Sequence, residues 1–268
     1  MQTAISSPVP VMRRFSIIWI FVVGLAVFRS YGLAQSGEGG LDARLFRSIN
    51  NSRSSLLDHL IDFTDNAAVP VGVALPAGFA VYGIAADHRY ERVSAYMIGA
   101  SAAVATLITW GTKQLVKRER PYISLQNVHV SHVESGGSYS FPSGHSTFAF
   151  AIATAISLRY PKPLVIASVY TWAGLVAYGR VYLGLHYPGD VLGGALVGSA
   201  SALTLKFFSK EFDQLDRKIF GDDNVRRRQT QSNPISSRLE NKEERVENVS
   251  LVVIPSVDGA FVNITVHF

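Results

Sequence analysis

A cation, an imidazole and a carboxylate occur together in one short segment, Arg180–Asp190, which reads R-V-Y-L-G-L-H-Y-P-G-D. Uncharged residues run from Leu164 to Gly179 before this segment and from Val191 to Leu205 after it. Charged side chains in such apolar surroundings are costly unless they are paired or functional. The segment is therefore the first candidate for a site that does chemistry.

The end of this segment carries a helix-start pattern. Pro188 suits the first turn of a helix, so a helix is predicted to begin near Tyr187, with Asp190 in its first turn and His186 just outside. A carboxylate one turn from an imidazole can hold one ring nitrogen and leave the other free to attack or to carry a proton. In isolation, the same residues fit equally well a helix–helix corner whose polar side chains cap backbone groups.

A second segment, Phe141–Ser146, reads F-P-S-G-H-S and precedes the apolar run Thr147–Leu158. It predicts a turn that leads into a helix, with Ser143 and Gly144 at the start and His145 beside them. Backbone N–H groups at a helix start are unpaired and bind anions. Ser143 also suits a simple N-cap role.

Further cations lie upstream, where Lys113 and Arg120 are seven residues apart and Pro121 follows. They share one face if the helix continues that far. With Arg180 they supply three cations beside two histidines, one carboxylate and an anion-binding helix start. This combination predicts a phosphate site.

The three segments resemble an ordered signature: Lys-x6-Arg-Pro from Lys113, Pro-Ser-Gly-His from Pro142, and Arg-x5-His-x3-Asp from Arg180. The set closely resembles that of the type 2 phosphatidic acid phosphatase/vanadium haloperoxidase superfamily, over roughly residues 40 to 208. One departure is Gly179, where the family usually has serine before the arginine. It removes one hydroxyl contact near the phosphate and leaves every charged position filled.

The chemistry of phosphate esters and the resemblance imply the same roles. A phosphate ester needs its charge offset, a nucleophile in line and a proton for the leaving oxygen. His186, oriented by Asp190, would attack phosphorus to give a phosphohistidine, while His145 would protonate the leaving oxygen and then activate water. No metal or other cofactor is required in this scheme. The expected phosphate-binding groups are three cations, one hydroxyl and one backbone N–H: Lys113, Arg120, Arg180, Ser143 and Gly144.

Several functions compete for this site. The favoured one is a metal-independent phosphatase acting on a lipid phosphate or diphosphate, such as phosphatidate, phosphatidylglycerophosphate, undecaprenyl diphosphate or a lipid A phosphate. A soluble periplasmic non-specific acid phosphatase and a vanadate-dependent haloperoxidase would use the same residues. A zinc hydrolase built on His145, His186 and Asp190 is disfavoured because the neighbouring cations repel a metal. A non-catalytic lipid-binding protein would not need two histidines beside three cations.

Other residues carry weaker signals. His129 and His132 could form a metal pair, although exposed loop residues near the site are the better interpretation. Four aromatic side chains could line an acyl or prenyl entrance or lie at a membrane interface: Tyr122, Phe141, Tyr182 and Tyr187.

Composition narrows the class of protein. The 268 residues include no cysteine, which excludes disulfides, a thiolate nucleophile and a cysteine-based zinc site. The net charge of +5 includes the motif cations, and no nucleic-acid-binding motif accompanies it. The expected partners are a phosphorylated lipid and a membrane.

The chain divides into four expected parts. Residues 1–35 have the layout of a secretory signal peptide or an uncleaved membrane anchor, with Arg13-Arg14 before the uncharged run Phe15–Phe28. Residues 36–208 are predicted to form the helical phosphatase domain. Residues 209–248 are polar and predict a linker or tail. Residues 249–268 predict a β-hairpin around an Asp-Gly turn.

Within the helical part, Leu41–Phe63 predicts one or two amphipathic helices lying on a surface. The uncharged runs Ala67–Ala86 and Val93–Thr112 each match a membrane thickness. The predicted fold is an all-α bundle, transmembrane rather than soluble and secreted, with its active site at one end. If every run spans, the basic linkers at Arg89 and Arg159 share one side with Arg13-Arg14, and all three motifs lie on the other. The positive-inside rule then makes the basic side cytoplasmic and the site periplasmic or extracytoplasmic. The resemblance to the bacterial membrane-associated lipid phosphatases of the family implies a bacterial inner membrane, with secretion to the periplasm as the alternative.

Overall fold

The structure is a computed structural model that describes residues 39–130, 139–221, 249–256 and 259–266. It divides into two compact units, with the boundary between Asp213 and Gln214, and each unit is described by itself. The predicted signal peptide or anchor over residues 1–35 lies outside the described residues.

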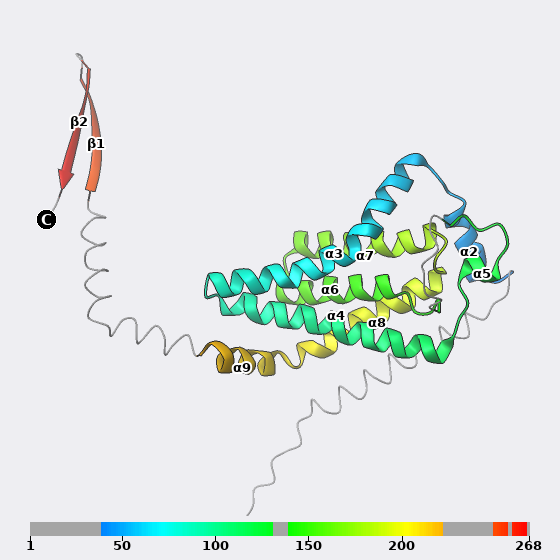
Figure 1. The fold of residues 1–268 in the computed structure, drawn as a ribbon. Helices are drawn as coiled ribbons and strands as arrows, with labels where there is room; N and C mark the ends of the chain where they lie inside the picture. The colour runs from blue at the N-terminus through cyan, green and yellow to red at the C-terminus, as the bar shows by residue number, and fades with distance from the viewer. Residues whose placement is uncertain (1–38, 131–138, 222–248, 257–258, 267–268) are drawn as a thin grey trace, which may run out of the picture. The chain divides into compact units, whose positions relative to one another are not determined.

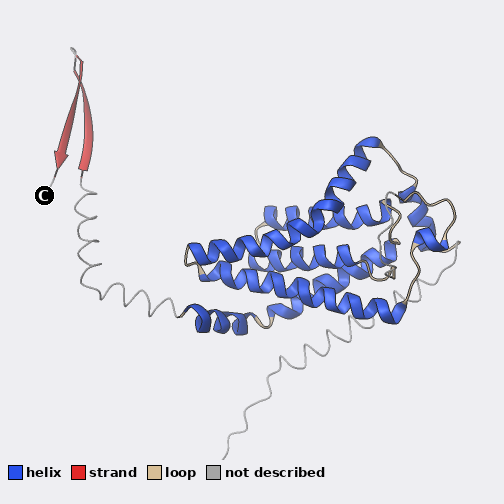
Figure 2. Ribbon diagram, in the orientation of Figure 1, coloured by secondary structure: helices blue, strands red, loops and turns tan. Residues whose placement is uncertain are grey.

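The described part of the first unit is entirely helical outside its loops (Figures 1 and 2). α6 is its central helix and packs against α4, α7 and α8, while α3 packs on α4 and α7. The helices, with α9 reaching across the unit boundary, are α2 Leu41–Asn50, α3 Ser55–Ala85, α4 Arg89–Val116, α5 Pro121–Ser124, α6 Gly144–Arg159, α7 Pro163–Tyr182, α8 Pro188–Lys206 and α9 Ser209–Phe220.

The amphipathic pair predicted over Leu41–Phe63 is only partly present. α2 is a separate amphipathic helix, but the second half of that range is the first part of the long helix α3. Ser54 starts α3, because its side chain accepts a hydrogen bond from the backbone N–H of Leu57 at 3.3 Å. Nothing between Phe63 and the apolar run interrupts the helix, so the two predicted elements are one.

Several helices have the length and apolar composition needed to cross a membrane. They are α3, the stretch Arg89–Ser124 that contains α4, and α7. α8 and α9 pass the same test together as a pair bent by 61°. Large apolar side chains on these helices are exposed, among them Phe63, Val81, Leu107 and Trp110. Exposed apolar surface of this extent indicates contact with lipid, and the predicted transmembrane helical bundle is confirmed.

Glycines bring α8 close to α6. A Cβ atom at Gly198 would lie 2.2 Å from the backbone oxygen of Thr147, and one at Gly194 would lie 2.6 Å from that of Ser143. Because backbone atoms cannot move aside as a flexible side chain can, these positions require glycine. The close packing holds the start of α6 beside α8.

Gly198→Ala is therefore expected to lower the thermal unfolding midpoint of the detergent-solubilised protein, since overpacking of this kind costs about 1–3 kcal/mol. Gly174→Ala is the matched control, because a Cβ atom at that helical glycine meets nothing within 4 Å. The control should be as stable as the parent or slightly more stable. Equal midpoints for the two variants would contradict the close-packing account.

The turns between α3 and α4 and between α6 and α7 meet at one end of the bundle, here called the far end. The rings of Tyr90 and Tyr160 pack edge to face there, and the guanidinium of Arg159 lies 3.8 Å from the centre of the Tyr90 ring. Arg89 also forms a 2.9 Å ion pair with Asp213. The three motifs lie at the helix ends opposite to these turns.

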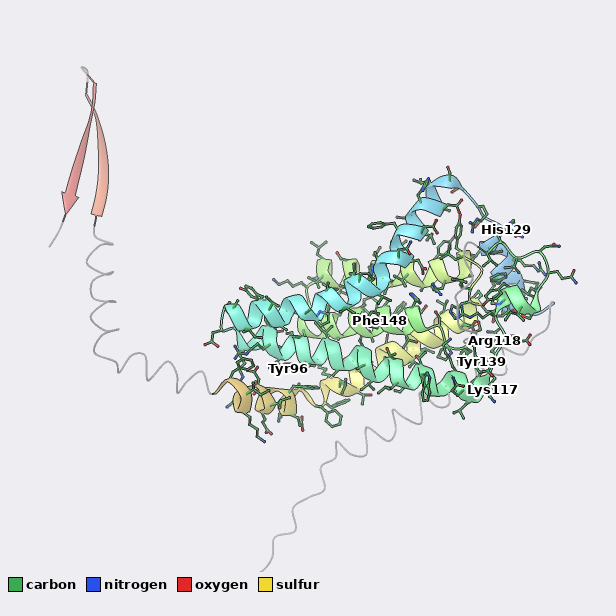
Figure 3. All side chains as sticks on the ribbon, in the orientation of Figure 1. Tyr96, Lys117, Arg118, His129, Tyr139 and Phe148 are labelled. Carbon is green, nitrogen blue, oxygen red and sulfur yellow. The ribbon has the colours of Figure 1, made fainter. Side chains whose placement is uncertain are left out.

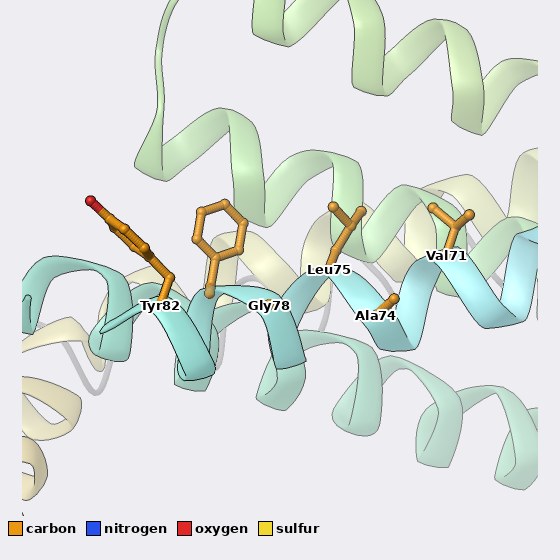
Figure 4. Close-up of a pocket in the computed structure, with 6 residues that line it drawn as sticks. Val71, Ala74, Leu75, Gly78 and Tyr82 are labelled. Atoms are coloured by element: carbon orange, nitrogen blue, oxygen red, sulfur yellow. The ribbon is translucent and has the colours of Figure 1, made fainter. Parts of the chain in front are cut away.

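An open apolar groove of about 410 Å³ lies along the second half of α3 (Figure 4). It is lined by Val71, Ala74, Leu75, Gly78, Phe79 and Tyr82. It contains none of the motif residues, so it is separate from the candidate site.

The first residues of the predicted linker or tail form a helix, and residues 222–248 lie outside the described residues. α9 covers Ser209–Phe220, with Phe212, Leu215 and Ile219 at helical spacing. The predicted hairpin is present as β1 Val249–Ser256 paired antiparallel with β2 Gly259–Val266. Asp258 in its turn lies outside the described residues.

Candidate active site

The third motif connects α7 to α8 through a tight turn. Arg180 lies in the last turn of α7, and its backbone oxygen accepts hydrogen bonds from the N–H groups of Leu185 and His186, both at 3.1 Å. α8 then begins at Pro188, and the Asp190 carboxylate accepts a 2.8 Å hydrogen bond from the Tyr187 N–H. The predicted helix start is confirmed, with His186 just outside it.

His186 is almost completely buried beside charged groups. Burial lowers its pKa to about 3, and the nearby Arg180 and Lys113 act in the same direction against the opposing effect of Asp190. The imidazole is therefore neutral at neutral pH, the form in which a ring nitrogen can act as a nucleophile.

The contact between His186 and Asp190 differs from the predicted one. Nδ1 of His186 lies 3.7 Å from Oδ2 of Asp190, which is too long for a hydrogen bond. The hydroxyl of Ser140 lies between them, 3.3 Å from Nδ1 and 2.5 Å from Oδ2. Sequence analysis did not single out Ser140, because a serine ahead of a turn is ordinary.

Arg118 is a second residue that sequence analysis missed. Its guanidinium donates to Asp190 Oδ1 and to Asp42 Oδ2, both at 2.6 Å, and lies 3.9 Å from the centre of the Tyr187 ring. Asp42 also accepts a 2.8 Å hydrogen bond from the Gly189 N–H at the start of α8. In the sequence, Arg118 is one charged residue of a K-R-E-R run that looks like a solvated surface.

Lys113 and Arg120 do not share one helix, so the condition under which the sequence put them on one helix face is not met. α4 ends at Val116, and Lys117 adopts a left-handed conformation with φ 49°. Arg120 precedes the short helix α5, where Pro121 occupies the first position. A residue before proline disfavours the helical conformation, so α4 cannot run into α5. Lys113 donates to the backbone oxygen of Tyr139.

Arg180 has an acidic partner from another helix. Its Nη1 lies 2.7 and 3.0 Å from the two carboxylate oxygens of Asp65 on α3, and both side chains are buried. Asp65 is the last acidic residue before the apolar run of α3. This position is the one feature of the sequence that could have indicated a partner for Arg180. The ion pair fixes one end of the guanidinium.

Gly179 is explained by packing. A Cβ atom at this position would lie 3.1 Å from Cγ2 of Ile61 on α3, tighter than ordinary contact. The serine that the family usually carries here would push against Ile61. Glycine at position 179 therefore allows α3 to approach α7 more closely than serine would.

The second motif forms the predicted turn and helix start. Ser143 precedes α6, and its N–H donates to the backbone oxygen of Asp190 at 3.0 Å. Its hydroxyl accepts a 3.2 Å hydrogen bond from Ser146 and does not cap α6. A Cβ atom at Gly144 would meet nothing within 4 Å, so space lies open beside this helix start. His145, half-buried, follows in the first turn.

The three motifs meet at one end of the bundle. The charge on Lys113 is within electrostatic reach of Arg120, Asp190 and Arg180, and His186 is within reach of Lys113. Figure 3 shows Arg118, Lys117, Tyr139 and His129 at this end, and Tyr96 away from it.

The residues with weaker sequence signals, the two loop histidines and the four aromatic side chains, do not form a metal pair or an entrance in the described residues. The His129 side chain is exposed, and its backbone N–H and oxygen both pair with the Asn50 side chain, while His132 lies outside the described residues. In the described segments, no group of three or more histidine, aspartate or glutamate side chains could hold a metal. Phe141, Tyr182 and Tyr187 are buried, so they do not line an entrance.

The chain is similar to known proteins of one family. A family model described as "PAP2 superfamily" matches residues 94–213. The chain is 36% identical over 80 residues to the lipid A 4'-phosphatase of Bacteroides thetaiotaomicron, covering 30% of this chain and only 35% of that relative. It is 31% identical over 168 residues to the bacitracin transport permease protein BcrC of Bacillus licheniformis, covering 62% of this chain and 78% of that relative.

Among solved structures, a transmembrane PAP2 type phosphatidylglycerolphosphate phosphatase from Bacillus subtilis has the same fold. The TM-score is 0.53 and the identity 22%, over 73% of this chain and 96% of that chain.

Proposed function

Because the chain belongs to the PAP2 superfamily, we propose that it is a membrane phosphatase that hydrolyses a lipid phosphate or diphosphate through a phosphohistidine, without a metal. The observation that carries this proposal is the buried, neutral His186 beside the cations Arg180 and Lys113. A neutral imidazole next to fixed positive charges is suited to attack a phosphate that those charges hold.

Substrate binding falls to the cations and to the start of α6. Lys113, Arg120 and Arg180 offset the charge on the phosphate oxygens, and the Ser143 hydroxyl and Gly144 N–H add hydrogen bonds. In this structure the Lys113 ammonium donates a hydrogen bond to the backbone oxygen of Tyr139. When the phosphate binds, its oxygen replaces the Tyr139 oxygen as the acceptor. Preorganised donors of this kind stabilise the charge that develops during phosphoryl transfer.

The first chemical step forms a bond from His186 Nε2 to phosphorus and breaks the bond from phosphorus to the leaving oxygen. His145 gives its proton to that oxygen, and Asp190 stabilises the positive charge that develops on the His186 ring. In the second step, His145 takes a proton from water as the water oxygen attacks phosphorus. The bond between phosphorus and Nε2 then breaks, which releases inorganic phosphate and restores both histidines.

The substrate is proposed to be a lipid because the bundle exposes apolar surface and holds its polar site at one end. A lipid lying in the same membrane would present its phosphate at that depth. The relative named as a lipid A 4'-phosphatase supports this substrate class.

Purified protein is expected to release phosphate from at least one of phosphatidate, phosphatidylglycerophosphate, undecaprenyl diphosphate and lipid A. EDTA should leave the rate unchanged, because the cations do the electrostatic work of a metal. Vanadate should inhibit competitively as a phosphate mimic. Loss of activity in EDTA that zinc restores would instead support a zinc hydrolase, and bromide oxidation with vanadate and peroxide would support a haloperoxidase.

The site is proposed to face the periplasm. The far end carries Arg89, Arg159, Lys162 and Lys206 on its turns and helix ends, and basic residues mark the cytoplasmic side. This arrangement supports a phosphate site on the periplasmic side of the membrane.

Single cysteines test this orientation against a background without native cysteine. In intact cells, a membrane-impermeant thiol reagent should label Gln126→Cys, which lies exposed at the site end, and should not label Pro161→Cys at the far end. Pro161→Cys should react after permeabilisation. Labelling of Pro161→Cys alone in intact cells would show the inverted orientation, and labelling of both would contradict a membrane-spanning bundle.

A further inference from the structure

The gap between His186 and Asp190 raises the question of what orients the imidazole. The 3.7 Å separation of Nδ1 and Oδ2 excludes a direct hydrogen bond in this arrangement. The Asp190 carboxylate already accepts from three donors: the Arg118 guanidinium, the Tyr187 N–H and the Ser140 hydroxyl. The carboxylate is therefore held without the help of His186.

The direction of the hydrogen bonds at Ser140 follows from its single hydroxyl proton. At 2.5 Å from an ionised carboxylate oxygen, that proton belongs to the bond with Asp190, since a carboxylate only accepts. The Ser140 oxygen can then only accept from Nδ1 of His186, 3.3 Å away. This arrangement requires the imidazole proton on Nδ1 and leaves Nε2 bare.

We propose that Ser140 is a positioning residue that connects Asp190 to His186 and holds His186 in the tautomer whose Nε2 can attack phosphorus. This inference rests on the proposed phosphatase function for its consequence in catalysis, but the tautomer itself is a property of the resting protein. Ser140 does not touch the phosphate in this scheme, because its hydroxyl is engaged with Nδ1 of His186 and with Asp190, on the side of the ring away from the attacking Nε2.

Arg118 hydrogen-bonds to both Ser140 and Asp190, the two residues that precede His186 in this relay. Its backbone oxygen accepts a 2.7 Å hydrogen bond from the Ser140 N–H, while its side chain donates to Asp190 and to Asp42. Asp42 in turn accepts from the Gly189 N–H on α8. One residue therefore fixes the hydroxyl and the carboxylate relative to each other.

During attack, the Nδ1 proton stays on the ring while Nε2 bonds to phosphorus, so the ring becomes positively charged. The charge of Asp190 reaches the ring through the polarised Ser140 hydroxyl. Ser140 keeps its own proton throughout, and the leaving oxygen still receives a proton from His145. The relay thus moves no proton and acts by orientation and electrostatics.

Kinetics of Ser140→Ala test the relay. We expect kcat to fall about 10- to 100-fold with KM changed less than about threefold, the size typical of losing a group that orients a functional histidine. Ser201→Ala is the matched control, because that buried hydroxyl in α8 donates only to the Val197 backbone oxygen. The control should retain the activity of the parent.

A double-variant cycle tests whether Ser140 and Asp190 act in series. If Ser140 acts only by connecting Asp190 to His186, removing it has no further effect once Asp190 has been replaced. The kcat of the double variant Ser140→Ala/Asp190→Asn should therefore equal that of Asp190→Asn alone. Losses that multiply would overturn the serial relay, and so would a Ser140→Ala variant with the parent's kcat.

Nitrogen NMR of isotope-labelled histidine decides the tautomer without reference to activity. The His186 signal, identified by its absence in His186→Ala, should show a protonated Nδ1 and a bare Nε2 in the parent, and a mixture or the reverse in Ser140→Ala. The same tautomer in both proteins would overturn the proposal. A parent protein that shows the expected tautomer but hydrolyses no lipid phosphate would instead refute the proposed function.

Discussion

His186→Ala is expected to lower kcat/KM for lipid-phosphate hydrolysis by at least about 10⁴-fold. Removal of the nucleophile has an effect of this size in enzymes whose catalytic residues act together. The three cations remain, so the variant should still bind inorganic phosphate with an affinity close to that of the parent. Rates of phosphate release and protection of the protein by phosphate against thermal unfolding provide the two measurements.

His129→Ala is the matched control for this variant. His129 lies at the same end of the bundle with an exposed side chain, and its contacts with Asn50 use only its backbone. Its removal should leave hydrolysis unchanged. An His186→Ala protein within a few-fold of the parent would remove His186 from the mechanism.

His145→Ala is expected to slow hydrolysis of an alkyl phosphate by about 10²–10⁴-fold, the usual contribution of general acid–base catalysis. An alkoxide needs a proton to leave, whereas a nitrophenolate does not. The first turnover of a nitrophenyl phosphate should therefore proceed at close to the parent's rate in this variant.

The second step gives a further signature of the same variant. Without His145 to activate water, the phosphohistidine should accumulate, and nitrophenolate should appear as a burst followed by slow turnover. Rapid-mixing absorbance measurements resolve the two phases. A first turnover slowed equally for the alkyl and the nitrophenyl ester would show that His145 does not protonate the leaving group.

Much of the site follows from local sequence because its motifs are local structures. Pro188 and Asp190 start α8 where the pattern predicts, and the Phe141–Ser146 turn leads into α6. Such patterns depend on backbone preferences of neighbouring residues, which sequence shows directly. The apolar runs likewise predict long helices, because every residue of a span must suit the bilayer.

The remaining features depend on tertiary contacts that no local pattern encodes. Ser140, Arg118 and Asp65 act on motif residues from elements 46 to 115 positions away in the chain. The neighbours of Ser140 and Arg118 do not distinguish them from ordinary loop or surface residues, and Asp65 stands out only as the last acidic residue before the apolar run of α3. The end of the helix between Lys113 and Arg120 is likewise not visible in the sequence, since nothing in the K-R-E-R run shows that Lys117 adopts a left-handed conformation.

The most direct test of the account is whether phosphorus becomes covalently attached to His186. The parent protein, mixed with a lipid substrate that carries a radiolabelled phosphate, is quenched in alkali, in which a phosphohistidine survives, and the labelled peptide is identified by mass spectrometry. The account predicts label on His186 during turnover of the lipid and none in His186→Ala. With a radiolabelled nitrophenyl phosphate, whose leaving group needs no proton, it predicts more label in His145→Ala than in the parent. Turnover without protein-bound phosphate, or label on another residue, would contradict the account.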